Sequence, residues 1–243
     1  MRYMGGKFRQ SKAIVECLRP AVNPETIYVE PFCGAMWSAV RVIRELHPGM
    51  VILNDINKPL MLLWQKCILE GTSWLPTGLQ EIESNYQQIK HAQDMDNPLT
   101  AWYGNALSFG GKWFGGVART DHVGQIKVMD AKTEALKSVP KIRLSNLSYQ
   151  MTTIPDGSVV YCDPPYENRV KAHNFQGFDY PEFWQWVREL SQRCYVFTSC
   201  FDCPSDFRPI HEWGDTVVRH LNSRGSDGTN EKLVIYKEGV QYV

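Results

Sequence analysis

Hydrophobic and polar residues follow two alternating patterns along this 243-residue chain. Short apolar runs rich in β-branched and aromatic residues predict buried strands, whereas apolar residues three or four positions apart predict amphipathic helices. The two kinds of element take turns, which is typical of an α/β fold with a mostly parallel sheet. The predicted strands are 27–30, 50–53, 141–150, 158–162, 194–198, 216–221 and 232–236, and the last two form a closing hairpin.

The predicted helices separate most of these strands and cover residues 11–18, 38–46, 60–70, 81–93, 130–139 and 181–192. The first strand–helix–strand unit has a tight turn at Gly34 and an acid, Asp55, after its second strand. This layout suits a nucleoside cofactor, because the turn lets the backbone approach the ligand and the carboxylate can hold both ribose hydroxyls. A nicotinamide-binding unit shares the layout but requires more glycines around a pyrophosphate. Fewer glycines favour a cofactor without phosphates.

The most distinctive stretch is the predicted strand 158–162 with the turn that follows, Asp163-Pro-Pro-Tyr166. A residue before proline is kept extended and proline fixes its own φ, so this turn is stiff. It lies past the carboxyl end of a strand, where open α/β sheets bind ligands. Asp163 and the Pro164 carbonyl can accept both hydrogens of an exocyclic amino group, and the Tyr166 ring can stack on a base. The alternative is a proline-rich turn after a core strand.

This turn resembles the catalytic motif of the Dam-like family of DNA adenine methyltransferases, and three further stretches occur in that family's order. They are Tyr3-Met-Gly-Gly-Lys7, Glu30-Pro-Phe-Cys-Gly34 and Asn54-Asp-Ile-Asn57. The motifs frame nearly the whole chain, which resembles a phage or prophage member of the family. The resemblance implies a Rossmann-like methyltransferase sheet of seven strands, mostly parallel, with a helical target-recognition insertion.

The resemblance also implies how the chain is divided and what it does. Residues 1–68 and 140–243 would form the catalytic domain, and residues 69–139 a DNA-binding insertion. The expected activity is site-specific transfer of a methyl group from S-adenosylmethionine to the amino nitrogen of an adenine flipped out of double-stranded DNA. Related motifs also serve amino groups of cytosine, RNA or protein glutamine. A DNA-binding relative with weak catalysis is a further alternative.

The motifs carry the site residues that the family implies. The expected catalytic residues are Asp163, Pro164, Pro165 and Tyr166. The expected cofactor-binding residues are Tyr3, Gly6, Lys7, Glu30, Pro31, Phe32, Gly34, Asp55 and Asp163. The chain departs from the family at Ala35 and Met36, where further glycines are usual. Met36 adds bulk where the backbone and the cofactor approach closely.

Residues 100–116 alternate aromatic residues with glycines. This composition suits a loop that approaches a DNA backbone and stacks or wedges against bases, or a connection that packs its aromatics in the core. The position in the family order favours the first interpretation. The expected DNA-binding residues are Lys112, Trp113, Arg119 and, in a later polar loop, Arg224.

The net charge of zero argues against a uniformly basic nucleic-acid binder. Basic residues are nevertheless concentrated in residues 1–20 and 101–150. These two segments form either one phosphate-facing surface or ordinary solvated charge.

The seven cysteines are an odd number without a disulfide-like pattern, which fits a reducing compartment. Cys200 and Cys203 form a single C-x-x-C pair, and zinc would need further ligands, for which His211 and His220 are loose candidates. We therefore expect no metal. No run of about twenty apolar residues and no apolar signal segment occur, so a cytoplasmic protein without a membrane span is expected. The expected partner is double-stranded DNA, and the expected oligomeric state is a monomer or weak dimer.

Overall fold

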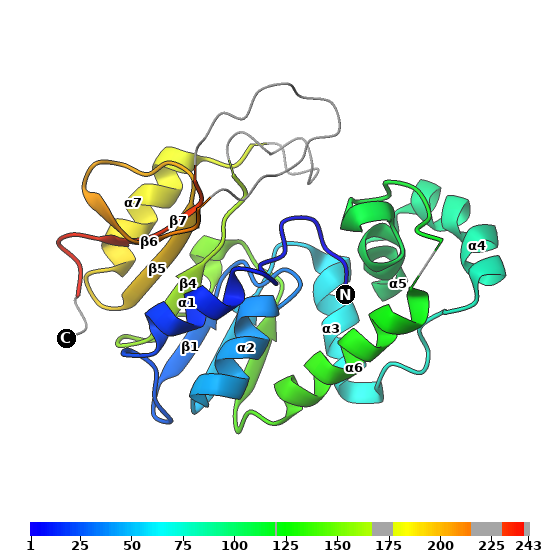
Figure 1. The fold of residues 1–243 in the computed structure, drawn as a ribbon, viewed down its shortest axis with the longest axis horizontal. Helices are drawn as coiled ribbons and strands as arrows, with labels where there is room; N and C mark the ends of the chain where they lie inside the picture. Colours follow the sequence, from blue (N-terminus) through cyan, green and yellow to red (C-terminus); the bar gives the residue numbers. More distant parts are fainter. Residues whose placement is uncertain (120, 167–176, 215–229, 241–243) are drawn as a thin grey trace.

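The computed structural model describes residues 1–119, 121–166, 177–214 and 230–240. Within these residues, a seven-stranded sheet has the order β3-β2-β1-β4-β5-β7-β6 (Figure 1). Neighbouring strands are parallel, except that β7 is antiparallel to β5 and β6. The strands are β1 (Ile27–Glu30), β2 (Met50–Asn54), β3 (Ile142–Ser145), β4 (Val159–Cys162), β5 (Tyr195–Cys200), β6 (Phe207–Glu212) and β7 (Lys232–Tyr236). The predicted α/β class and the mostly parallel methyltransferase-type sheet are confirmed.

Helices cover both faces of the sheet, and a further group lies to one side of it (Figure 1). The α-helices are α1 (Ser11–Leu18), α2 (Trp37–Leu46), α3 (Lys58–Glu70), α4 (Leu79–Ala92), α5 (Pro98–Ala101), α6 (His122–Lys137) and α7 (Tyr180–Leu190). Three short helical turns are η1 (Trp102–Ala106), η2 (Phe109–Gly111) and η3 (Tyr149–Met151). None of the helices that the structure describes is long and apolar enough to span a membrane.

The central strands are buried on both faces. Val29 and Val160 belong to the core cluster that contains α7 residues, whereas Tyr28 and Val159 belong to the cluster shared with α1, α2 and α3. Parallel strands covered by helices on both sides have apolar residues at consecutive positions, which is why their sequences are continuous apolar runs. Polar residues therefore begin where these strands end.

Three element predictions are wrong. The strand predicted over residues 141–150 ends at Ser145, and Tyr149–Met151 forms a short helical turn. The helix predicted from residue 130 begins at His122. The prediction missed its first turns because α6 buries polar residues such as Gln125, so its apolar periodicity is weak. The predicted hairpin of 216–221 with 232–236 is also wrong, because both edges of β7 are paired with β5 and β6. The strand β6 contains Pro209 beside a register shift, as proline in an edge strand often does, and this obscures its pattern. Residues 216–221 themselves lie outside the described part.

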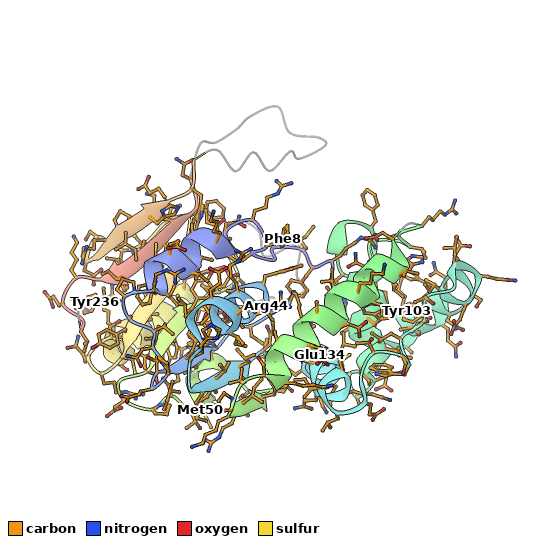
Figure 2. The ribbon with its side chains drawn as sticks, turned by 60° about the horizontal axis from the view of Figure 1, so that its bottom comes forward. Phe8, Arg44, Met50, Tyr103, Glu134 and Tyr236 are labelled. Atoms are coloured by element: carbon orange, nitrogen blue, oxygen red, sulfur yellow. The ribbon has the colours of Figure 1, made fainter. Side chains whose placement is uncertain are left out.

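The helical region at residues 69–139 shares its core with the sheet domain. Tyr86, Trp102 and Tyr103 belong to the same buried cluster as Trp64 of α3 and Leu53 of β2. Figure 2 shows Tyr103 among the helices on the far side from Tyr236 of β7, and Arg44 and Glu134 where α2 meets α6. The predicted domain boundary therefore runs through one continuous core, and assignment of this region to target recognition stays a prediction.

The amino-terminal segment packs against this helical region. The Arg2 backbone amide donates to Gln125 Oε1 at 2.5 Å, and the Met4 amide donates to the Gly111 carbonyl at 3.1 Å. Gly111 has φ of 71°, and a Cβ there would lie 2.5 Å from the Tyr3 nitrogen. This glycine therefore permits the backbone contact that fixes the segment carrying Tyr3.

Replacing Gly111 with alanine is expected to lower the free energy of unfolding by about 2–4 kcal/mol, from a strained φ together with a backbone clash. Gly110 is a matched control, because it also has a positive φ but an added Cβ would meet nothing within 4 Å. Its alanine variant should lose only about 1 kcal/mol. Urea unfolding measures both values, and equal losses would contradict a role for the contact with Tyr3.

Candidate active site

Three acids meet at the carboxyl edge of the parallel strands. Glu30 ends β1, Asp55 follows β2 and Asp163 follows β4. The strands β1 and β4 are neighbours, and the chain extends the sheet from them in opposite directions. A ligand crevice is expected at such a switch point, outside the strand ends.

Asp163 is held by two donors on one of its oxygens. Lys7 Nζ lies 2.7 Å from Asp163 Oδ1, and the Tyr166 hydroxyl donates to the same atom at 2.9 Å. Among the described residues, no group donates to the other oxygen, Oδ2. Burial raises the pKa of Asp163, and attraction to Lys7 opposes that shift. The arrangement presents one carboxylate oxygen that can still accept a hydrogen bond.

Lys7 is buried between two carboxylates. Only 6% of it is exposed, and its ammonium lies 3.1 Å from Glu231 as well as beside Asp163. Burial lowers the pKa of Lys7, but attraction to Asp163 and Glu231 outweighs it, so the pKa lies above its ordinary value. The lysine therefore stays charged at neutral pH.

Sequence analysis missed Glu231, which immediately precedes β7 and is 4% exposed. Gln10 Nε2 donates to Glu231 Oε2 at 3.1 Å, and the Tyr166 hydroxyl lies 2.8 Å from Glu231 Oε1. A lone acid between a polar loop and an apolar run gives no recognisable signal. Its contacts with Lys7 and Tyr166 join residues from opposite ends of the chain.

The Tyr166 hydroxyl and ring are both engaged. The hydroxyl lies between Asp163 and Glu231, the ring lies 4.7 Å from Lys7 Nζ, and Phe201 packs edge-on against it at 4.9 Å. These contacts fix the ring plane beside Asp163. Pro164, directly after Asp163, is buried, and Pro165 is half-buried. Stacking of Tyr166 on a base stays a prediction.

The Gly34 loop is fastened by Asp55. Its Oδ2 accepts from the Gly34 amide at 2.8 Å and its Oδ1 accepts from the Asn57 amide at 2.9 Å. Burial raises the pKa of Asp55 to about 6. Gly34 and Met36 have φ of 46° and 55°, so the turn is as tight as predicted. The Met36 side chain is fully buried in the core cluster, so its bulk is turned into the protein interior.

Lys132 of α6 is a second residue that sequence analysis did not place here. It is 2% exposed, donates to the Ala35 carbonyl and lies 3.3 Å from the Trp37 ring centroid. Burial lowers its pKa well below the ordinary value. The sequence suggested that Lys132 is part of a basic surface, and this was wrong because the side chain reaches inward. The helical region thereby supports the loop at Ala35.

Glu30 is buried, and only one of its two carboxyl oxygens has a partner of normal hydrogen-bond geometry among the described groups. The Tyr28 hydroxyl donates to Glu30 Oε1 at 2.6 Å. Burial raises the pKa of Glu30, and hydrogen bonding by Tyr28 and Ser38 opposes that rise. The other oxygen, Oε2, is the one without such a partner. Such an orphaned acceptor indicates a missing donor. Next to it, the Pro31 carbonyl accepts from Asn54, and Phe32 packs on Tyr149 at 5.3 Å.

Glu30 should make stability depend on pH. Burial raises its pKa to about 8 from an ordinary 4.5. Between these values the folded state holds a proton that the unfolded state has lost, so the free energy of unfolding falls as pH rises and levels off above about pH 8. Glu30→Gln is expected to remove the part of this fall that extends up to about pH 8, leaving the part due to Asp55 below about pH 6, and to gain about 2–5 kcal/mol at about pH 8. Unfolding curves across this range test it, with exposed Glu25→Gln as the control. The same decline in Glu30→Gln would contradict the assignment.

Tyr3 and Gly6 lie against the Gly34 loop. A Cβ on Gly34 would come within 3.3 Å of the Tyr3 ring, and one on Gly6 within 3.0 Å of the Trp37 ring. Tyr3, Gly6 and Lys7 therefore reach the predicted site together.

The end of β3, to which sequence analysis assigned no role, holds the Asp55 loop in place. The Asn146 side chain donates to the Asp55 carbonyl at 2.8 Å, and the Leu147 amide donates to Asn54 Oδ1 at 2.9 Å. Ile56 and Leu147 are exposed apolar residues on these two adjoining loops. They provide an apolar surface beside the carboxylate of Asp55.

The predicted DNA-binding residues have different environments. Lys112 is exposed, and Arg119 is 80% exposed while pairing with Glu83 at 3.3 Å. Trp113 is half-buried, because its ring packs on Gly104 and its Nε1 donates to Gln93 at 3.1 Å. Most aromatics of residues 100–116 are core residues: Trp102, Tyr103 and Phe114 are buried. For these three the alternative of core packing holds. Arg224 lies outside the described residues.

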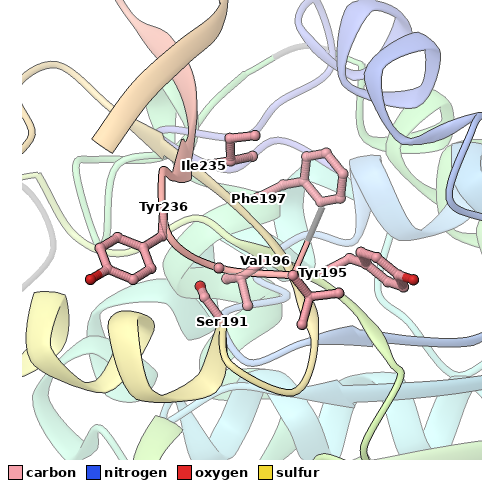
Figure 3. Close-up of a pocket in the computed structure, with 8 residues that line it drawn as sticks. Ser191, Tyr195, Val196, Phe197, Ile235 and Tyr236 are labelled. Atoms are coloured by element: carbon pink, nitrogen blue, oxygen red, sulfur yellow. The ribbon is translucent and has the colours of Figure 1, made fainter. Parts of the chain in front are cut away.

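Figure 3 shows a small hollow elsewhere, between β5, β7 and the end of α7. It includes Ser191 and Tyr195, at the amino end of β5, and contains no charged residue. The hollow is therefore at the opposite edge of the sheet from Asp163. No cluster of three metal-ligating side chains occurs in the described ranges, and His220 lies outside them.

The strand order, with acids at the switch point, is that of a Rossmann-like methyltransferase sheet. Residues 3–110 match the model of the family of D12 class N6 adenine-specific DNA methyltransferases. This confirms the resemblance to the Dam-like enzymes over that part of the chain, which includes the Tyr3, Glu30 and Asp55 motifs and ends before Asp163.

A crystal structure of a proposed methylase from Haemophilus influenzae is similar with a TM-score of 0.37 and 11% sequence identity, covering 93% of this chain and 95% of that one. So distant a likeness carries no argument. No curated protein matches the sequence.

Proposed function

We propose that this methyltransferase transfers a methyl group from S-adenosylmethionine to the exocyclic amino nitrogen of an adenine flipped out of double-stranded DNA. The observation that carries the proposal is the state of Asp163. Lys7 and Tyr166 both occupy Oδ1, which leaves Oδ2 as an acceptor for an incoming amine at the carboxyl edge of β4.

The residues at the ends of β1 and β2 fit the cofactor. Glu30 Oε2 would accept from its ammonium group, whose positive charge would favour the ionised form of this carboxyl. Asp55 has lone pairs remaining for ribose hydroxyls beyond its two backbone bonds. The exposed Ile56 and the Tyr3 ring offer flat apolar contacts for its adenine. When bound, S-adenosylmethionine supplies an electrophilic methyl group on a sulfonium.

The catalytic part of the chain acts by positioning and by charge. Asp163 Oδ2 accepts from the target amine, which directs the nitrogen lone pair away from the base ring. Positive charge that develops on this nitrogen is stabilised by the nearby carboxylate. Lys7 favours the ionised form of Asp163, and Tyr166 with Glu231 holds the geometry, so little reorganisation is needed at the reaction.

Exposed side chains beside the amino-terminal segment suit a DNA-facing surface. Phe8 and Phe109 are 58% and 67% exposed. Arg9 and Lys112 are exposed next to them along the chain, and the Met4–Gly111 bond joins the two segments. Cations can contact phosphates while aromatic rings stack on or wedge between bases. We assign DNA contacts to Lys112, Trp113 and Arg119 on this basis, and target recognition to residues 69–139. The contact expected of Arg224, which lies outside the described residues, stays a prediction from the sequence.

Incubation with labelled S-adenosylmethionine and unmethylated duplex DNA, followed by mass analysis of the nucleosides, tests the function. N6-methyladenine is the expected product. Methylated cytosine would show that the substrate is the cytosine amino group. Label found only in RNA or in protein, each added in parallel, would identify that molecule as the substrate. DNA binding without label transfer would indicate a catalytically weak relative.

A further inference from the structure

Two cysteine side chains lie beside the catalytic turn. Cys200 ends β5, and Cys203 lies in the bend that follows. Cys162 of β4 pairs with Thr198 of β5, so Cys200 is farther toward the catalytic edge of the sheet. Both thiols are free, Cys200 is buried and Cys203 is half-buried. Their side chains are hydrogen-bonded to each other. One thiol is thus accessible and its neighbour is in position to react with it.

A hydrogen bond and a nearby lysine favour a reactive thiolate at Cys203. The hydrogen bond from Cys200 lowers the pKa of Cys203 more than burial raises it. Lys232, which pairs with Cys200 across the strands, also lowers it, while Asp202 and Asp206 act in the opposite direction. The thiolate is the nucleophilic form of cysteine.

The residue between the cysteines connects them to the candidate active site. The Phe201 ring meets the Tyr166 ring edge-on, with 4.9 Å between centroids and an interplanar angle of 85°. On the facing strand, Lys232 directly follows Glu231, which contacts Lys7 and Tyr166. A disulfide between Cys200 and Cys203 would close a ring of four residues that includes Phe201, and would change the backbone conformation that positions the Phe201 side chain.

We propose that Cys200 and Cys203 are a reversible disulfide site, and that closing the disulfide displaces Phe201 and Tyr166 and slows methyl transfer. The oxidant is a small-molecule disulfide. The Cys203 thiolate attacks one of its sulfurs, which forms a mixed disulfide and releases one thiolate. Cys200 loses its proton and attacks Cys203 Sγ, which forms the protein disulfide and releases the second thiolate. The two cysteines are oxidised, the small disulfide is reduced, and the two protons pass to the released thiols.

Oxidised glutathione is a suitable probe, and peptide mass mapping gives the primary result. The expected product is an internal Cys200–Cys203 disulfide without a glutathione adduct, which dithiothreitol reverses. Cys203→Ser should form no such disulfide, whereas Cys17→Ser, which changes a half-buried cysteine in α1, should react like the parent protein. Stable glutathione adducts, or two unreacted thiols, would overturn the proposal.

Hydrogen exchange of the peptide containing Tyr166 tests the displacement without requiring activity. Exchange should change on oxidation in the parent protein and not in Cys203→Ser, and identical exchange would overturn the link to Tyr166. The effect on methyl transfer rests on the proposed function, and a fall of about tenfold or more, reversed by dithiothreitol, is expected. If the reduced protein transfers no methyl group, the proposed function fails, while mapping and exchange still decide the disulfide site.

Discussion

Asp163→Asn is expected to lower the single-turnover rate of methyl transfer by about 10²- to 10³-fold. The amide keeps the shape of the side chain but removes the negative charge that stabilises the positive charge developing on the target nitrogen. It also replaces one acceptor oxygen by a donor. The measurement is transfer of labelled methyl groups to duplex DNA at saturating cofactor, with cofactor binding followed separately by calorimetry.

Asp156→Asn is the matched control, because Asp156 precedes β4 at the opposite edge of the sheet and its side chain is 80% exposed. It should retain the parent rate. Since Lys7 keeps Glu231 as a partner in Asp163→Asn, this variant should still fold. Unchanged methyl transfer by a folded Asp163→Asn protein would refute the proposed role of this carboxylate.

Lys7→Met is expected to reduce methyl transfer by about 10- to 100-fold near neutral pH and to move the acidic limb of the rate profile to higher pH. Burial raises the pKa of Asp163 and the Lys7 ammonium counteracts it. Without that ammonium, the raised pKa leaves more Asp163 protonated at a given pH, and a protonated carboxyl group is a poorer acceptor. The rate should therefore recover in part as pH increases.

The profile of kcat/KM against pH for Lys7→Met and the parent protein measures this shift. Lys12→Met is the control, since Lys12 is an exposed lysine of α1 in the same part of the chain. A uniform loss at every pH would mean that Lys7 acts only by packing. A shift to lower pH would contradict the electrostatic role assigned to it.

Much of the fold was predictable because its strands are covered by helices on both faces. The strands β1, β2, β4 and β7 are apolar runs ended by polar or turn residues, and α1 and α2 have clear apolar stripes. Elements that lack this pattern were missed or were predicted with wrong bounds. The edge strand β6 contains proline, and α6 buries polar residues, so neither has the expected periodicity.

The motifs at the strand ends were predictable for a related reason. Parallel strands end at the same edge, so Glu30, Asp55 and Asp163 had to come together once the strand order was right. The stiffness of the turn at Pro164 follows from local backbone sterics alone. These are properties of short stretches and of topology, and they need no knowledge of side-chain packing.

Contacts between distant segments had no such local signal. Glu231 becomes part of the site because β7 inserts between β5 and β6 and carries it to Lys7, and Lys132 because α6 packs on α2. Gly111 is required by the backbone of Tyr3, not by its own turn alone. By itself the sequence determined the alternation of strands and helices, the stiff turn and the acids at the strand ends, since these depend on local sterics and periodic burial. The tertiary structure alone decided which buried charges neutralise one another, because a polar group removed from water must find a partner wherever the folded chain provides it.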